Sequence, residues 1–205
     1  MRVALARVLV AVVTLGLASP TIAGPPTDEV RRYTEHVQRI LEDPGLQQSD
    51  KRDAVRKVAQ QVFDVTETAK RALGTHWNKR TPAEQEEFVQ LFADLLERTY
   101  IAKIDLYGGE RVQFTGEAVD GDYATVRAKV VTRQGTEVPV VARMHRRGDR
   151  WLIYDLAIEN VSLVGNYRSQ FDRIIRTSSY EELVKRLKTK RDEFLPRKEA
   201  PPARS

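Results

Sequence analysis

Three segments in the first half of the chain repeat apolar residues at the three- and four-residue intervals of a helix. The first covers residues 27–42 and the second covers residues 50–73, which Gly74 closes. The third begins at Thr81-Pro82-Ala83-Glu84, where an N-cap threonine, a first-turn proline and the glutamate of a capping box stand in order. Its wide apolar face continues to residue 107, so we expect a long helix that a large surface must cover.

From Arg111 onward the apolar residues recur at every second position, which is the period of a half-buried strand. Glycine-containing turn signals at residues 120–121, 134–135 and 147–149 divide this region at regular spacing. The pattern predicts four strands, at residues 112–119, 123–132, 136–146 and 151–159. One apolar face on an antiparallel meander is typical of a sheet that packs against helices.

The chain after the fourth strand returns to helical patterns. We expect residues 160–165 to form an apolar connection, a helix to begin near Asn166, and a second capping box at residues 179–182 to start a last helix. Residues 196–205 have almost no apolar side chains to bury, and we expect a disordered tail there. The predicted fold is therefore α+β, a four-stranded antiparallel meander packed against several helices, in one domain of residues 24–195.

The first 23 residues have the layout of a secretory signal peptide. Arg2 and Arg7 precede an apolar run over residues 8–17, and Thr21-Ile22-Ala23 offers small residues for cleavage after Ala23. The run is too short for a membrane span, which needs about 20 apolar residues. Alternatives are a buried N-terminal helix and an uncleaved anchor, but the pattern favours export.

Composition excludes several classes of chemistry. The chain has no cysteine, its three histidines (His36, His76 and His145) are far apart, and glycine patterns for phosphates and a GxSxG nucleophile motif are missing. We therefore expect neither a metal nor a cofactor. The formal net charge is only +5, and the basic residues are interleaved with acidic ones, so a nucleic-acid partner is not expected.

Two carboxylates are the best candidates for acid–base chemistry. Asp155 and Glu159 lie four residues apart on the predicted fourth strand, which places both on one face, where either could act as a base. The alternative is that they pair with Arg143 or Arg127 as structural ion pairs. His145 should face away from the apolar side of the sheet, and His76 should pack or cap within a loop.

The apolar surfaces themselves allow either a closed core or a ligand cavity. Residues 100–107 would face the apolar row of the sheet, where Ala124, Ala128 and Ala142 leave volume that larger side chains would have filled. Periodicity alone does not separate these alternatives.

Two longer blocks resemble the MlaC, or toluene-tolerance, family. The first runs from Leu73-Gly74-Thr75-His76-Trp77-Asn78 through residues 81–88 to Tyr100, and the second, more specific block spans residues 151–171. Its core reads Val161-Ser162-Leu163-Val164-Gly165-Asn166-Tyr167-Arg168-Ser169-Gln170-Phe171, preceded by Asn160 where the family more often has glycine. The resemblance covers residues 28–193. It implies a soluble periplasmic protein that carries phospholipid between the outer membrane and an ABC transporter of the inner membrane.

The resemblance also implies an apolar cavity between sheet and helices, with the lipid headgroup near its mouth. By matching positions, the acyl chains would contact Tyr100, Ile104, Val126, Val140, Ala142, Met144, Trp151 and Ile153. The mouth or its supporting wall would comprise Val161, Leu163, Val164, Tyr167 and Phe171. Arg168 could reach the headgroup phosphate, or it could pair with Asp172 or Glu159.

These expectations leave alternatives of different classes. The leading hypothesis is a monomeric lipid carrier that binds phospholipid and meets the inner-membrane ABC transporter complex and an outer-membrane lipoprotein complex. A carrier of hopanoid-type lipids would share similar motifs. A cone-shaped α+β enzyme for small apolar substrates, with Asp155 or Glu159 as base, and an exported interaction module with a filled core are the other readings.

Overall fold

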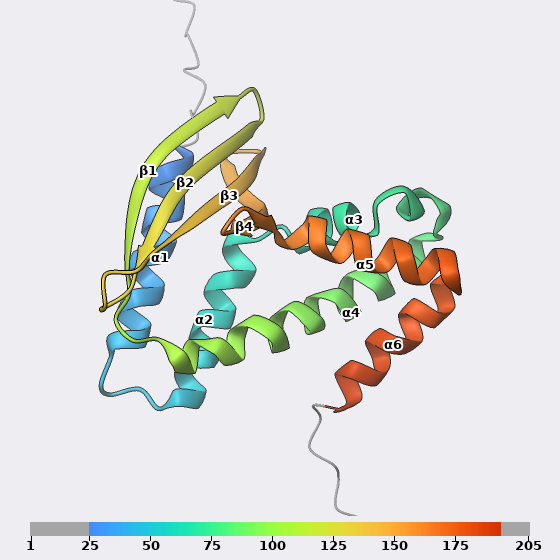
Figure 1. Ribbon diagram of the computed structural model, residues 1–205, viewed down its shortest axis with the longest axis horizontal. Helices are drawn as coiled ribbons and strands as arrows, with labels where there is room; N and C mark the ends of the chain where they lie inside the picture. Colours follow the sequence, from blue (N-terminus) through green and yellow to red (C-terminus); the bar gives the residue numbers. More distant parts are fainter. Residues whose placement is uncertain (1–24, 194–205) are drawn as a thin grey trace, which may run out of the picture.

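The computed structural model of the protein describes residues 25–193 (Figure 1). The expected signal peptide at residues 1–23 and the expected tail at residues 196–205 lie outside the described residues. The elements are α1 (Pro26–Glu42), α2 (Gln48–Val62), α3 (Val65–Leu73), the 3₁₀ helix η1 (Gly74–Lys79), α4 (Pro82–Tyr100), the 3₁₀ helix η2 (Ile101–Leu106), β1 (Arg111–Asp120), β2 (Tyr123–Val131), β3 (Glu137–Arg147), β4 (Arg150–Ile158), β5 (Val161–Ser162), α5 (Leu163–Thr177) and α6 (Tyr180–Glu193).

The α+β prediction is confirmed, but the antiparallel sheet has five strands in chain order and not four. The additional strand β5 pairs with the end of β4, because Glu159 and Asn160 turn the chain with φ of 49° and 65°. Asparagine tolerates this left-handed conformation better than most residues do. Ser162 then accepts a hydrogen bond from the Gly165 amide and caps α5, so the predicted apolar connection is instead a strand and a helix start.

The predicted helix over residues 50–73 is two helices, α2 and α3. Phe63 is extended and forms a parallel bridge with Ile153 of β4, and the Asp64 amide donates to the Ile153 carbonyl over 2.8 Å. The Asp64 carboxylate accepts from the Glu67 amide over 2.9 Å and so caps α3. The break therefore docks the chain onto the sheet.

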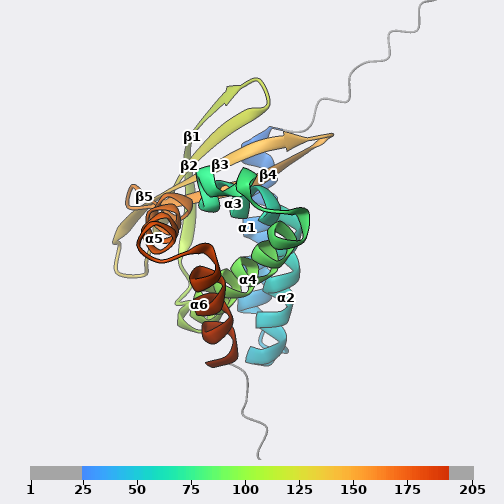
Figure 2. The same ribbon diagram turned by 90° about the vertical axis from the view of Figure 1, so that its right-hand side faces the viewer.

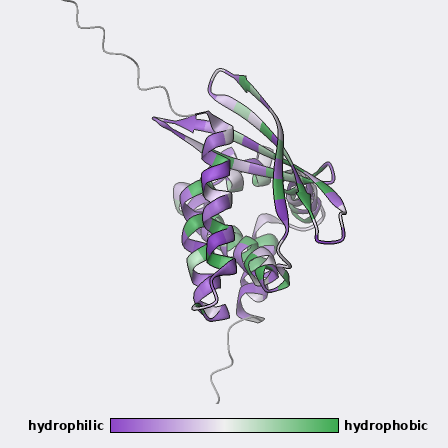
Figure 3. Ribbon diagram, turned by 90° about the vertical axis from the view of Figure 1, so that its left-hand side faces the viewer, coloured by the Kyte–Doolittle hydropathy of each residue, from purple (hydrophilic) through white to green (hydrophobic). Residues whose placement is uncertain are grey.

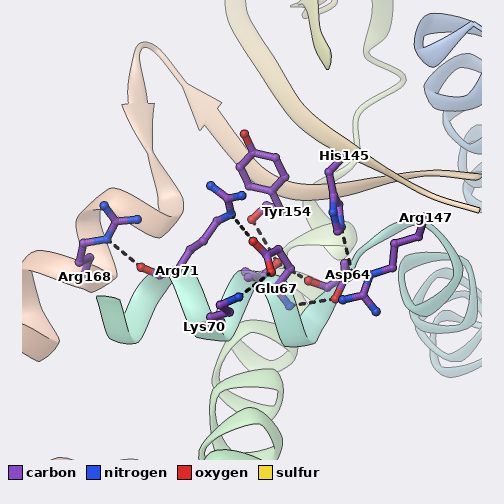
Figure 4. Close-up of polar contacts among 9 residues, drawn as sticks. Asp64, Glu67, Lys70, Arg71, His145, Arg147, Tyr154 and Arg168 are labelled. Carbon is purple, nitrogen blue, oxygen red and sulfur yellow. Dashed lines mark hydrogen bonds and ion pairs between the residues drawn. The ribbon is translucent and has the colours of Figure 1, made fainter. Parts of the chain in front are cut away.

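Side chains of β3 hold this break in place (Figure 4). Asp64 is 6% exposed, and its Oδ2 lies 3.1 Å from His145 Nε2 and 2.9 Å from Arg147 Nε. Both partners come from the sheet face that points away from Met144, as expected for His145. A carboxylate buried to this degree needs such partners, and His145 has a structural role here.

The helices pack in two groups. In Figures 1 and 2, α3 and α5 lie side by side and α6 folds back toward α4, and these four helices share a core of buried side chains. At its centre the Phe88, Phe92 and Phe171 rings lie 5.4–5.8 Å apart, two of the three pairs edge to face. The other group consists of α1 and α2, which pack against each other and against the sheet.

The capping box that opens α4 offers a direct test of one local signal. Thr81 accepts from the Glu84 amide over 3.3 Å, and Glu84 accepts from the Thr81 amide over 2.7 Å. We expect Thr81→Ala to lower the free energy of unfolding by about 1 kcal/mol in urea denaturation. Thr81→Ser keeps the acceptor and should stay near the parent; equal losses in both variants would contradict the capping role.

Candidate functional site

A pocket of about 790 Å³ lies between the inner face of the sheet and the helices α1, α2 and α4. Its walls come from nine of the helices and strands together with η2, so residues far apart in sequence converge on one space. Figure 3 shows hydrophobic and hydrophilic residues alternating along the strands, which is the pattern that turns one sheet face toward this space. The volume is within the range of protein sites for small molecules.

The sheet side of the pocket is built on small and branched residues. Val126 stands opposite Ala142, and Ala128 stands opposite Val140, so one pocket face carries both cross-strand pairs. The alanines contribute only a methyl group each. The volume that the sequence leaves at these two positions is therefore part of the pocket, while Ala124 is buried in a core cluster with Met144 and Val62.

The end of α4 and η2 form the opposite wall. The predicted helix to residue 107 continues as a 3₁₀ helix after Tyr100, and 3.0 residues per turn align every third side chain. Ile101 and Ile104 pack on the α1–α2 cluster, and Asp105 pairs with Arg52 of α2 over 3.0 Å. The remaining row is Tyr100, Lys103 and Leu106, three exposed residues that line the pocket and mark its rim.

Most polar groups on the pocket wall hydrogen-bond within the protein. Burial works to lower the pKa of Arg56, but hydrogen bonds to Asp53 and Glu97 outweigh it and raise that pKa. Burial and a 3.0 Å hydrogen bond to Glu42 raise the pKa of Tyr107 to about 12. These groups stay paired at neutral pH. The rest of the pocket wall is mainly apolar.

Seven of the thirteen lipid-contact residues predicted from the resemblance line this pocket. They are Tyr100, Ile104, Val126, Val140, Ala142, Ile153 and Leu163. The structure therefore brings them together, and their contact with a lipid stays a prediction.

Two predicted acyl-chain contacts lie elsewhere. Met144 and Trp151 are 0% and 5% exposed and belong to the solid core at the hairpin end of the sheet, where Val62 and Tyr33 cover them. Val126 and Ala142 belong to the same buried cluster and also line the pocket, so the pocket borders this core. Alternation correctly predicted which sheet face carries Met144, but not whether the pocket extends to that point of the strand.

The predicted mouth residues, apart from Leu163, also lie outside the pocket. Val164 and Phe171 are buried in the core of α3 to α6, and Tyr167 packs against that core. Tyr167 touches the site through Tyr100, to which it is hydrogen-bonded. The burial of Tyr100 and this hydrogen bond raise the pKa of Tyr100. Val161 is 62% exposed on β5.

The suggested headgroup residue is engaged away from the pocket. Arg168 Nε donates to the Arg71 carbonyl oxygen over 2.7 Å, as Figure 4 shows, and its methylene groups lie over Gly74. Neither suggested partner takes it: Asp172 pairs instead with His76 over 2.9 Å and with Arg176. Arg168 thus ties α5 to the end of α3.

Sequence reasoning missed the helical side of the pocket. Val30, Val37 and Leu41 of α1 and Val55 and Val58 of α2 line it. Their spacing was visible as an amphipathic stripe, but a stripe of this kind does not distinguish a pocket wall from a closed core.

Of the two candidate bases, Asp155 lines the pocket, but its carboxylate is engaged in structural contacts. Asp155 is 5% exposed; its Oδ2 accepts from Arg143 and, over 2.7 Å, from Ser162 Oγ, and its Oδ1 accepts from the Val164 amide over 3.0 Å. The proposed pairing with Arg143 is therefore confirmed. Glu159 is exposed in the turn after β4, so the two carboxylates do not share a strand face.

Two further kinds of feature are absent from the described residues. Between residues 25 and 193, no helix combines the length and the apolar character that a membrane span requires. Within the same range, no three histidine or acidic side chains come close enough together to hold a metal ion.

Comparisons with known proteins agree with the resemblance. The family model described as MlaC protein matches residues 31–189. None of the curated proteins matches the chain. Among solved structures, a phospholipid-binding protein from Ralstonia solanacearum, solved in complex with a phospholipid, is 24% identical, with a TM-score of 0.73 over 82% of this chain and 98% of that one.

That similarity shows a common fold. A putative NTF2-like transpeptidase from Campylobacter jejuni is 15% identical over 62% of this chain and 95% of its own, with a TM-score of 0.39, which is too low to support an argument.

Proposed function

The chain belongs to the MlaC family, and from this premise we propose that it is a lipid carrier that holds phospholipid by its acyl chains in the pocket. Family membership points to a binding and transport protein and not to an enzyme. The structurally similar protein from Ralstonia solanacearum, solved with a phospholipid, supports the same ligand class for this chain.

One observation carries the proposal: a pocket of about 790 Å³ with a mainly apolar wall. Each methylene group moved from water into such a space contributes about 0.8 kcal/mol, so hydrocarbon chains gain more there than any small polar ligand would. Closed packing would have left no such space. The pocket also needs no reactive group, because a carrier only shields and releases its ligand.

We place the protein in the periplasm, moving phospholipid between the outer membrane and an inner-membrane ABC transporter. The signal-peptide pattern of residues 1–23 and the family membership support this assignment. The partners on the two sides would be the transporter complex and an outer-membrane lipoprotein complex, with the carrier as a monomer between them.

Native mass spectrometry of the exported protein tests the proposal. The full chain is produced with its own N-terminus in a bacterium with two membranes, and the protein is purified from the periplasmic fraction without detergent. We expect a mass that corresponds to cleavage after Ala23 and one diacyl phospholipid per chain, which would be identified by fragmentation.

The outcomes separate the alternatives. A bound hopanoid in place of phospholipid would change the ligand class, and protein that neither contains nor takes up lipid would remove the proposal. Recovery only from the cytoplasm would contradict the assignment to the periplasm while leaving lipid binding to be judged by the bound mass.

A further inference from the structure

The charged groups on the pocket wall differ in whether the protein already neutralises them. Arg56 of α2 lies 2.6 Å from Glu97 of α4 and also pairs with Asp53. Arg56 and Glu97 therefore neutralise each other between the two helices. Glu110 accepts from the Gly108 amide over 2.9 Å. None of these groups is free to bind a charged ligand.

The uncharged polar groups on the wall are mostly engaged as well. Gln38 donates to the Glu110 carbonyl over 3.2 Å, Thr34 donates to the Val30 carbonyl over 2.8 Å, and Tyr107 donates to Glu42. Gln60 is exposed and carries no charge. The wall therefore offers few partners to the polar end of a lipid.

Lys103 is the exception. It lines the pocket from the exposed row of η2, and its Nζ lies 5.5 Å from the centre of the Tyr100 ring. Across residues 25–193, no carboxylate forms an ion pair with this amine; the nearest acidic residue in sequence, Asp105, pairs with Arg52. The ring restrains the ammonium group without neutralising it.

We infer that Lys103 binds the phosphate of the lipid headgroup at the rim of the pocket, which makes it a headgroup-selecting residue. The inference rests on the proposed function, because acyl chains in the pocket leave the headgroup at the rim. A phosphate carries a negative charge and accepts charge-assisted hydrogen bonds, and Lys103, which has no ion-pair partner within residues 25–193, is placed to donate them. Tyr100 and Leu106 on either side would contact the first carbons of the chains.

A competition between two lipids tests the role of Lys103. The delipidated protein is offered phosphatidylglycerol and diacylglycerol with identical acyl chains, which differ in the phosphate headgroup, and native mass spectrometry gives their ratio in the pocket. We expect Lys103→Gln to lower the preference for phosphatidylglycerol about fivefold, the effect of one lysine beside an anionic headgroup. Lys103→Arg keeps the charge and should retain the preference.

The matched control is Lys57→Gln. Lys57 is an exposed lysine of α2 that does not line the pocket, so its loss changes net charge equally without touching the rim. Total lipid bound per chain should be the same in all four proteins. An unchanged lipid ratio in Lys103→Gln, with normal uptake, would overturn the inference and leave the proposed function intact; no uptake in any protein would remove both.

A second measurement identifies the source of the phosphate. The NMR signals of the Lys103 side-chain amine, assigned by their loss in Lys103→Gln, are followed while phosphatidylglycerol or inorganic phosphate is added. We expect a shift with phosphatidylglycerol and little with inorganic phosphate, since only the lipid is held by its chains. A shift with inorganic phosphate and none with the lipid would overturn the headgroup assignment.

Discussion

Ala128→Trp is expected to lower the affinity for phospholipid at least tenfold. Ala128 projects from β2 into the pocket opposite Val140, and an indole at this position would fill space that the acyl chains need. Excluding only two methylene groups costs about 1.6 kcal/mol, which is more than tenfold in affinity. The measurement is native mass spectrometry after incubation with phosphatidylglycerol.

The neighbouring position supplies the control. Arg127 is exposed and points to the opposite face of the sheet, so Arg127→Trp adds the same side chain to the same strand outside the pocket. It should bind lipid like the parent. Because the indole of Ala128→Trp enters open space, its free energy of unfolding should stay within about 1 kcal/mol of the parent. Parental lipid binding by a folded Ala128→Trp would show that the chains lie elsewhere.

Asp155→Ala is expected to lower the free energy of unfolding by about 3 kcal/mol in urea denaturation. The buried carboxylate joins three segments: it pairs with Arg143 of β3, accepts from Ser162 of β5 and accepts from the Val164 amide at the start of α5. Its removal leaves the buried amide and the Ser162 hydroxyl without their acceptor.

Two other variants make this prediction specific. Asp155→Asn keeps one acceptor oxygen and loses the charge, so its loss of stability should be smaller. Glu159→Ala, in the exposed turn that follows β4, should have little effect. If Asp155→Ala were as stable as the parent, the carboxylate would not be the tie between sheet and helix, and the enzyme hypothesis would regain its candidate base.

Local signals predicted most of the fold. Glycine turns and period-two alternation gave four strands to within one or two residues, since side-chain direction in a strand is a local property. The capping box at Thr81 placed the start of α4 correctly. The break at Phe63 was missed because the apolar residues of α2 and α3 keep a helical spacing across it, while contacts that hold the break, such as the hydrogen bond from the Asp64 amide to the Ile153 carbonyl, come from a distant strand.

The site was predicted less completely, because the spacing of apolar residues shows which face of a strand or helix is buried but not which part of that face lines the pocket. Ala142 and Met144 share a strand face and a buried cluster, yet Ala142 also lines the pocket and Met144 does not. Arg168 shows the same limit for charged residues. Its partner is a backbone carbonyl, which no pattern of side chains reveals.

The aromatic core of Phe88, Phe92 and Phe171 has no residue in common with the pocket wall. The core of α3 to α6 is thus centred on side chains that do not meet cargo, whereas buried residues of the sheet such as Val126, Ala142 and Ile153 also line the pocket. For the proposed carrier, this means that unloading need not loosen the centre of the helical core, and an empty molecule can make its return journey intact.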